Sequence, residues 1–376
     1  MVESFWLLAG VILYTYLGYP ALLGLLASWF RRPVRKGEPL PSLTLLIAAY
    51  NEEAVIGKKL ENSCSLDYPS DRLEIVVVSD GSTDRTDEIV RQFPDVRLDR
   101  VPVRGGKTAA LNHAVPRTKG EIIVFSDANP IYRPDALRKL VRAFADPEVG
   151  GVSGDVRLSP EGVTFGEAQG LYYRYERYIQ RKESELGSMI GCDGAMYAIR
   201  RECFVAPPPF FILDDFLISM AVTRQGYRVI YEPEAIAVED SPPALREEFR
   251  RKIRVLAGGF QTLLHRAGIP TSPLLLWCYL SHKVARWFCP FCLLFLFLLD
   301  LFLADRAGYR LLLFGQIAFY LWGGVGYLFE EKIGGKWRKL LLPTYFCVEN
   351  LAGIIGFFRA IGGKERVTWK SVGRRV

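Results

Sequence analysis

The chain has 376 residues, of which 50% are hydrophobic and 24% charged, and its formal net charge is +7. Its mean hydropathy of +0.12 is too high for an ordinary soluble enzyme, and its length allows two or three domains. The basic residues flank apolar segments and do not alternate with exposed aromatic residues. This pattern argues against a nucleic-acid partner and favours contact with anionic membrane lipids.

The first long apolar segment covers residues 4–30 and carries no charge. A segment of this length can cross a bilayer. A cleaved signal peptide is the alternative, but no basic stretch precedes the segment and no A-x-A-like site follows it. Basic residues at positions 31, 32, 35 and 36 follow it, so the positive-inside rule places the chain after residue 31 in the cytoplasm. We therefore expect residues 1–37 to be an N-terminal transmembrane anchor.

The middle of the chain, residues 38–245, alternates between strand and helix patterns. Strands are predicted over residues 43–48, 75–79, 96–101, 122–126, 152–158 and 195–199. Helices are predicted over residues 54–63, 107–115, 135–144, 165–185 and 215–225. This alternation predicts an α/β domain with a mostly parallel central sheet and helices on both faces. The glycine motifs of dinucleotide-binding and P-loop proteins are absent from the sequence.

Polar residues follow three of the predicted strands. They are Tyr50, Asn51 and Glu52 after the first strand, Asp80 after the second, and Asp127 and Asn129 after the fourth. The carboxyl ends of parallel strands line the crevice where open α/β sheets bind ligands. The alternative for Asp80 is that it caps the next helix together with Asp84.

A glycine-rich turn opens the predicted helix at 107–115. Gly105 and Gly106 let the backbone approach an anion, and Lys107 adds a positive charge at the helix N-terminus. Together with the carboxylates, this turn predicts a phosphate group held by Lys107 or by a divalent cation bound at Asp127.

Apolar segments return near the C-terminus. We expect residues 287–304 and 311–329 to cross the membrane, because the link after residue 329 is basic. A weaker apolar segment, 340–358, is expected to lie in the interface or to re-enter, because the basic stretch 362–375 should stay inside. The sequence leaves open whether residues 340–358 form a fourth membrane crossing. The predicted organisation is completed by interfacial amphipathic helices over residues 246–283 and a transmembrane and interfacial region over residues 284–376.

Several sequence motifs carry a family resemblance. AAYNEE, VVSDGSTD, GGKTAALN and SDAN, in this order and spacing, resemble the nucleotide-binding half of glycosyltransferase family 2, which has the GT-A fold. GCDGAMYAIRRE, LDDF and FRRKIR, with flanking membrane spans, are similar to its membrane-integrated branch. That branch includes cellulose, hyaluronan and poly-N-acetylglucosamine synthases, and the resemblance covers nearly the whole chain.

The resemblance implies roles in donor binding. Tyr50, Glu52 and Asp80 would hold uridine or another nucleoside. Lys107 and Asp127 would serve the diphosphate and the sugar, with Mg²⁺ or Mn²⁺ bound at Asp127 and Asn129.

The resemblance also implies roles in acceptor binding and catalysis. Asp193 and Gly194 would lie at the acceptor cleft, Asp215 would be the general base, and Arg251 and Arg254 would cover the diphosphate.

Alternatives exist for two of these pairs. Asp214 and Asp215 are adjacent, so at a helix start only one of them faces a cleft, and both are also suited to capping the helix. Burial or a like charge would raise the pKa of the base and improve proton abstraction. Arg251 and Arg254 share a helix face, which suits a phosphate clamp, although they also suit a membrane-surface cluster.

The chain departs from the family pattern twice. The D-x-D motif reads Asp127-Ala128-Asn129, so a neutral amide replaces one carboxylate. Val255 stands in the Q-x-x-R-W element where a tryptophan would stack on an acceptor sugar. The first departure affects metal binding, and the second argues against processive polymer synthesis.

We expect a membrane-bound, inverting glycosyltransferase at the inner cell membrane, with several membrane spans and a cytoplasmic catalytic domain. Its donor would be a nucleotide diphospho-sugar, expected to be UDP-linked, and its acceptor a lipid-linked glycan in surface or exopolysaccharide assembly, with polysaccharide-assembly proteins as partners. The alternatives are a processive polysaccharide synthase and a single-sugar transferase that makes a glycolipid. Two further alternatives are not enzymes: an inactive scaffold or nucleotide-sugar sensor, and a transporter or pore.

Overall fold

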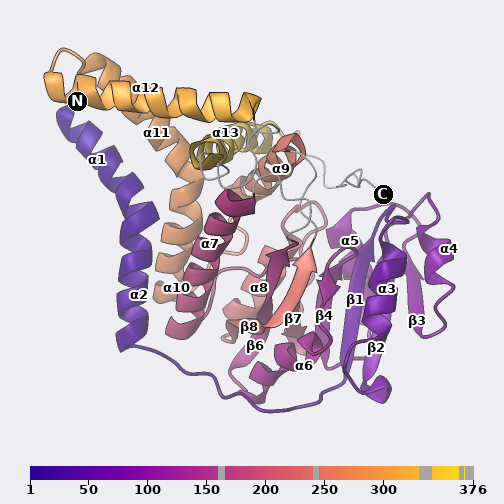
Figure 1. Cartoon of the computed structure of the whole chain (residues 1–376). Coiled ribbons are helices and arrows are strands. Elements are labelled where there is room, and N and C mark those ends of the chain that lie inside the picture. Colours follow the sequence, from indigo (N-terminus) through magenta and orange to yellow (C-terminus); the bar gives the residue numbers. More distant parts are fainter. Residues whose placement is uncertain (160–165, 240–244, 330–340, 364–367, 369–376) are drawn as a thin grey trace.

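The structure is a computed structural model that describes residues 1–159, 166–239, 245–329, 341–363 and 368. Figure 1 shows an α/β domain with a group of long helices beside it. The basic link after residue 329 and most of the basic stretch 362–375 lie outside the described residues.

One eight-stranded sheet forms the centre of the α/β domain, with the order β3-β2-β1-β4-β7-β6-β8-β5. The strands are β1 (Leu43–Ala49), β2 (Leu73–Ser79), β3 (Val96–Arg100), β4 (Ile122–Asp127), β5 (Ile131–Tyr132), β6 (Val149–Leu158), β7 (Tyr197–Arg200) and β8 (Arg228–Glu239). The first four are parallel to one another, β6 is parallel to β8, and β7 and β5 pair antiparallel with their neighbours.

Helices cover both faces of this sheet, as Figure 1 shows. They are α3 (Ile56–Cys64), α4 (Thr86–Val90), α5 (Lys107–Ala114), α6 (Ala136–Val141), α7 (Gly166–Leu186) and α8 (Asp214–Arg224), with short 3₁₀ turns at Ser70–Arg72, Val115–Arg117, Arg142–Ala145 and Arg201–Cys203. Alternate side chains of β1 enter two different cores: Leu45 and Ile47 lie in one, and Leu46 and Ala48 in the other. Because both faces are buried, every residue of the strand except Thr44 is apolar.

Four helical segments of the described chain are long and apolar enough to cross a membrane: Val2–Trp29, Pro273–Phe302, Ala307–Leu328 and Leu342–Ile361. The first comprises α1 (Val2–Leu13), a π-helical turn η1 (Tyr14–Gly18) and α2 (Tyr19–Trp29), and the second comprises α10 (Pro273–Cys278), a second π-helical turn η6 (Tyr279–Val284) and α11 (Ala285–Phe302). The others are α12 (Ala307–Leu328) and α13 (Leu342–Ile361). In Figure 1, α1 lies beside α11 and α2 beside α7, while α13 packs on α12 and on the amphipathic helix α9 (Leu245–Leu264).

The predicted α/β fold class with a mostly parallel sheet is confirmed, since four of the seven strand pairs are parallel. Strands β5 and β8 were not predicted from the sequence. β5 has only two residues, and two exposed residues, Pro233 and Glu234, interrupt the apolar pattern of β8. One continuous helix that begins at Pro273 and ends at Phe302 runs through residue 283, the boundary expected from the sequence.

Helices α9 and α13 approach each other closely at Gly356. A Cβ atom there would lie 2.9 Å from the backbone nitrogen of Ala257 and 3.1 Å from the carbonyl oxygen of Ile253. We expect Gly356→Ala to destabilise the protein by about 1–3 kcal/mol, because backbone atoms cannot move aside as a side chain would. The measurement is the melting temperature in detergent. Gly315→Ala in α12 is the matched control, because its Cβ would meet no atom within 4 Å. Equal melting temperatures for the two variants would contradict this close helix contact.

Candidate active site

The polar strand ends meet at one edge of the sheet. Ala48 of β1 pairs with Val78 of β2 and with Asp127 of β4. Asp127 ends its strand, and Tyr50 and Asp80 directly follow theirs, so all three residues lie at the same edge of the sheet. Parallel pairing therefore brings together residues that are up to 77 positions apart in the sequence, as predicted.

Asp80 holds the glycine-rich turn. Its carboxylate is fully buried and accepts hydrogen bonds from the backbone N–H groups of Gly105 (2.8 Å) and Gly106 (2.9 Å). Gly106 has a φ of +91°, a conformation that favours glycine. Asp84 bonds to the first residue of α4, because its Oδ1 accepts the backbone N–H of Thr86 at 3.0 Å. Asp80 thus fixes the shape of the turn that presents Lys107.

Tyr50 lies under this turn. The guanidinium of Arg104 stacks 3.5 Å from the centre of the Tyr50 ring, and its Nε is 3.9 Å from Asp80. The loop that carries Glu52 is fixed to the next loop, because the Glu52 backbone N–H donates to Thr86 Oγ1 at 2.8 Å. The structure therefore brings Tyr50, Glu52 and Asp80 to one place, and Arg104 lies over them as an additional planar cation.

Lys107 links the two halves of the site. Its Nζ lies 2.7 Å from Asp127 Oδ1 at the end of β4 and 3.6 Å from Asp214 Oδ2 at the start of α8. Burial alone would lower the pKa of Lys107, but Asp127, Asp214 and Asp215 outweigh it and the pKa is raised. Lys107 therefore carries a permanent positive charge, as expected of a group that binds phosphate.

The two adjacent aspartates differ in exposure. Asp214 is buried, whereas Asp215 is partly exposed. Burial, and then the charge of Asp214, raise the pKa of Asp215 to about 7, against the lowering effect of Lys107. Burial also raises the pKa of Asp214, although Lys107 opposes the shift. A carboxylate with a pKa near 7 is well matched to proton abstraction at neutral pH.

Asp193 and Gly194 lie beside Asp215. A Cβ atom at Gly194 would be 2.9 Å from Asp215 Oδ2 and 3.4 Å from Lys107 Nζ, so a larger residue would displace these groups. Asp193 accepts a hydrogen bond from Arg177 Nη2 at 3.0 Å. Arg177, on α7, also pairs with Asp155 at 3.2 Å, which fixes Asp193 from behind.

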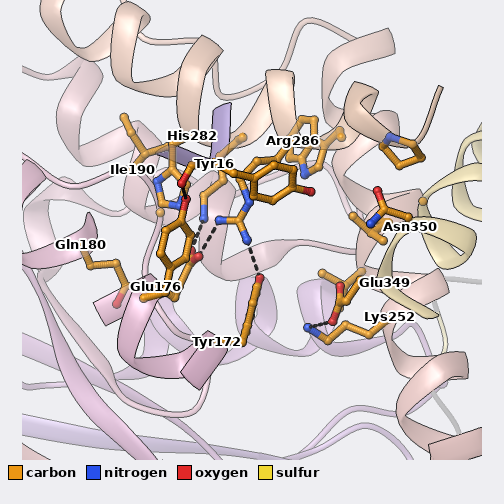
Figure 2. A pocket seen from close by; sticks show the side chains of 18 of the residues that line it. Tyr16, Tyr172, Glu176, Gln180, Ile190, Lys252, His282, Arg286, Glu349 and Asn350 are labelled. Carbon is orange, nitrogen blue, oxygen red and sulfur yellow. Dashed lines mark hydrogen bonds and ion pairs between the residues drawn. The ribbon is translucent and has the colours of Figure 1, made fainter. Parts of the chain in front are cut away.

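A cavity of about 640 Å³ opens next to Asp215 and extends between α7, α9, α11 and α13. Of the two adjacent aspartates, it is Asp215 that lines this cavity, together with Cys192 and Val255. Figure 2 shows this cavity, where aromatic and charged side chains from several helices converge. The sequence did not reveal this cavity, because its walls come from elements up to 337 positions apart.

Glu239 is a site residue that sequence reasoning missed. It ends β8, and its Oε1 accepts a hydrogen bond from Asn129 Nδ2 at 2.9 Å. Burial raises the pKa of the Glu239 carboxyl, Asp127 and Asp193 raise it further, and Arg251 and the bond from Asn129 oppose the shift. The sequence offered little indication of Glu239 as a strand-end residue, because β8 itself was not predicted.

Asp127, Asn129 and Glu239 together fit a hard divalent cation. They offer carboxylate and amide oxygens, the ligand type of Mg²⁺ and Mn²⁺. Among the described residues, no group of three or more acidic, histidine or cysteine side chains is close enough to form a complete metal cage. This donor set therefore suits an ion that takes further oxygens from a diphosphate and water.

The two predicted clamp arginines have different surroundings. Arg251 forms a bidentate pair with Glu248 one turn earlier on α9, with both N–O distances at 2.8 Å. Arg254 lies near enough to Asp214 to lower its pKa, although burial dominates the shift. Arg254 is thus the one directed at the Lys107 and Asp214 side of the site.

Comparison with known proteins matches part of the domain that carries this site. Residues 44–205 match the model of Glycosyl transferase family 2. The chain is 38% identical over 236 residues to a beta-monoglucosyldiacylglycerol synthase of Synechocystis sp. and 26% identical over 247 residues to the poly-beta-1,6-N-acetyl-D-glucosamine synthase of Staphylococcus aureus. These matches cover 60% and 62% of the chain, but only 49% and 58% of the two relatives.

A solved structure shares the fold over nearly the whole chain. It is a mannosyltransferase from Pyrobaculum calidifontis, solved with GDP-Man and Mn²⁺. The TM-score is 0.76 at 24% identity, with 96% of this chain and 100% of the other covered. The GT-A fold predicted from the motifs is confirmed.

The pKa of Asp215 generates a prediction about pH. If Asp215 accepts a proton, the rate should rise with pH through about 7 and then level off, because only the ionised carboxylate is a base. Asp215→Asn should lose a factor of about 10² to 10⁴ in turnover, with nucleotide affinity nearly unchanged. Asp214→Asn is the matched control and should cost far less. Steady-state kinetics and calorimetry measure both effects, and a reversed ranking would assign the base to Asp214.

The surroundings of Asn129 generate a prediction about the metal. Glu239→Gln should weaken Mn²⁺ binding roughly 10-fold, because it removes a carboxylate from the site. Asn129→Asp should bind Mn²⁺ at least as tightly as the unaltered chain, because it adds a charge. Paramagnetic resonance titration of Mn²⁺ with a nucleoside diphosphate present measures this without turnover. Glu234→Gln is the control on the same strand, and an unchanged affinity in Glu239→Gln would remove Glu239 from the site.

Proposed function

We propose that this protein, which carries a family 2 glycosyltransferase domain over residues 44–205, transfers a sugar from a nucleoside diphosphate sugar to a hydroxyl group of a lipid acceptor, with inversion at the anomeric carbon. The observation that carries the proposal is the position of Asp215. This carboxylate lies between the cationic Lys107 site and a cavity lined by helices that are apolar enough to enter a membrane.

The donor would bind at the strand ends. Tyr50, Glu52 and Asp80 would hold the nucleoside, which we expect to be uridine. Lys107 and Arg254 would face the diphosphate, since a permanently charged lysine and a guanidinium both suit phosphate oxygens. Mg²⁺ or Mn²⁺, when bound at Asp127, Asn129 and Glu239, would neutralise charge on the diphosphate.

The transfer is a single displacement. The acceptor oxygen forms a bond to the anomeric carbon while the bond from that carbon to the diphosphate oxygen breaks. Asp215 takes the proton of the acceptor hydroxyl, and the negative charge that grows on the leaving diphosphate is met by Lys107. Gly194 leaves room for the acceptor beside Asp215, because any side chain there would press on the carboxylate.

The acceptor would enter from the membrane side through the cavity. The named activities of the relatives fit this arrangement, since one is a glycolipid synthase and the other a polysaccharide synthase. We place the enzyme in the inner membrane with its catalytic domain in the cytoplasm, where nucleotide sugars are made. Its product would feed surface or exopolysaccharide assembly.

A processive polysaccharide synthase is the second candidate, favoured by the polymer-forming relative. A processive enzyme must retain its product while the spent nucleotide leaves. Val255 lines the cavity where an aromatic residue would stack on a sugar, and valine has no flat face for such stacking. We therefore propose addition of one or a few sugars to each acceptor.

Product analysis tests both candidates. Membranes that contain the protein should transfer label from one member of a panel of UDP- and GDP-sugars to a lipid-extractable product, and EDTA should abolish the transfer. Membranes with Asp215→Asn are the control. Thin-layer and gel separation should show short products even at a high ratio of donor to acceptor. Long polymer formed while most acceptor stays unused would establish the processive synthase instead.

A further inference from the structure

The cavity beside Asp215 holds an unusual number of charged groups for a site among apolar helices. Its described lining contains three acidic residues, Glu176, Asp215 and Glu349, and three lysine or arginine residues, Lys252, Lys283 and Arg286. Charges in such a low-dielectric place are costly unless they are paired. How they are paired decides which head group the cavity accepts.

Glu176 is the centre of the first cluster. Its carboxylate lies 2.6 Å from Arg286 Nη1, 3.1 Å from Lys283 Nζ and 2.8 Å from the ring nitrogen Nε2 of His282. Figure 2 shows these groups converging from α7 on one side and from η6 and α11 on the other. Burial alone would raise the pKa of Glu176, but the three basic groups overcome it and the pKa lies well below its usual range. Glu176 is therefore a permanent anion inside the cavity.

The neighbouring groups add further hydrogen bonds to this cluster but no cation without an acidic partner. Arg286 donates its second nitrogen, Nη2, to the Tyr172 hydroxyl at 2.8 Å. The other ring nitrogen of His282, Nδ1, lies 2.8 Å from Glu183, which also accepts a hydrogen bond from Tyr19 at 2.6 Å.

The second cluster joins α9 to α13. Lys252 Nζ lies 2.6 Å from Glu349 Oε1 and 3.9 Å from Glu248. Burial would lower the pKa of Lys252, but Glu349 leads several groups that raise it far above its usual value. In Figure 2 this pair stands opposite the Glu176 cluster across the cavity. Every lysine and arginine among the described lining residues thus has an acidic partner within the protein.

This arrangement is unfavourable for a lipid phosphate. A phosphate head group would have to take Arg286 or Lys252 from a carboxylate that already holds it, and the carboxylate would remain nearby as a repelling charge. The rest of the wall suits an uncharged lipid. Leu171, Leu256 and Trp287 offer apolar surface, while Gln180 and Asn350 can hydrogen-bond to hydroxyl groups.

We propose that the acceptor is an uncharged hydroxyl lipid, either a diacylglycerol or a glycosylated diacylglycerol, and that Glu176 and Glu349 exclude lipids whose head group is a phosphate. This inference rests on the proposed transfer to a lipid and names its substrate class. The volume of about 640 Å³ lies in the range of sites that take a small head group and the first part of its chains.

Lipid binding tests the substrate class without knowledge of the donor sugar. Full-length Asp215→Asn protein in a polyoxyethylene detergent, which brings no sugar hydroxyls of its own, is incubated with dioleoylglycerol, a monoglycosyl dioleoylglycerol or a polyprenyl phosphate. Native mass spectrometry counts the bound lipid. We expect the uncharged lipids to bind at least 10-fold more tightly than the phosphate. Equal or tighter binding of the polyprenyl phosphate would overturn the proposal.

A charge variant tests the cause. Glu349→Gln keeps the side-chain shape but leaves Lys252 with only the more distant Glu248, which Arg251 already holds at 2.8 Å, so binding of the polyprenyl phosphate should improve several-fold. Glu148→Gln is the matched control, because Glu148 is an exposed residue whose shortest ion pair, at 3.0 Å, is with the exposed Arg32. Unchanged lipid preference in a Glu349→Gln protein of normal melting temperature would overturn the exclusion role.

Transfer assays separate this inference from the proposed function. Transfer of sugar to polyprenyl phosphate but not to either glycerolipid would overturn the substrate class while the lipid transferase stands. Sugar transfer to soluble glycans alone would overturn the lipid transferase itself, and the substrate class with it. Transfer to either glycerolipid would support both.

Discussion

The 2.7 Å contact of Lys107 with Asp127 is the interaction on which the site depends. Three carboxylates approach one another here, because β4 ends at Asp127 and α8 begins with Asp214 and Asp215. Two unit charges 4 Å apart repel by about 4 kcal/mol at an effective dielectric constant of 20. The ammonium group of Lys107 offsets this repulsion, and the fixed glycine turn behind it keeps the group in place. The same cation is then available to a diphosphate.

Asp80 shows how the local sequence supports that contact. Each oxygen of its carboxylate accepts one glycine N–H group, so Asp80 shapes the backbone that carries Lys107 and keeps acceptor capacity for a nucleoside. A nucleoside that binds at Tyr50 would therefore meet a surface already fixed by Asp80 and covered by Arg104. Donor binding and the position of the lysine are linked through one turn.

The sequence was sufficient to predict the parallel half of the sheet and the polar residues at the ends of its strands. Strands β1, β2 and β4 are continuous apolar runs that end in polar motifs, so local pattern and topology agree. It was insufficient for β8, where Pro233 and Glu234 break the apolar pattern in mid-strand, and hence for Glu239. It was also insufficient for the cavity, because the pairing of Glu176 with Lys283 and Arg286 arises only when α7 packs against a helix about 110 residues later in the chain. Such long-range charge pairs leave no local periodicity.

The charge pairs of the cavity also join the long helices to the catalytic domain. The 30-residue helix Pro273–Phe302 contains Lys283 and Arg286, and these charges are costly to embed in a membrane unless the protein pairs them. Glu176 of the catalytic domain meets them, and Lys252 meets Glu349 of α13 in the same way. The ion pairs that exclude a phosphate are thus also the ones that join the long helices to the catalytic domain. Because the cavity lies between these two pairings, its shape depends on the docking of the two parts, and so does the path by which an acceptor reaches Asp215. A change of lipid head-group preference in this fold would therefore require paired substitutions, one on each side of the joint.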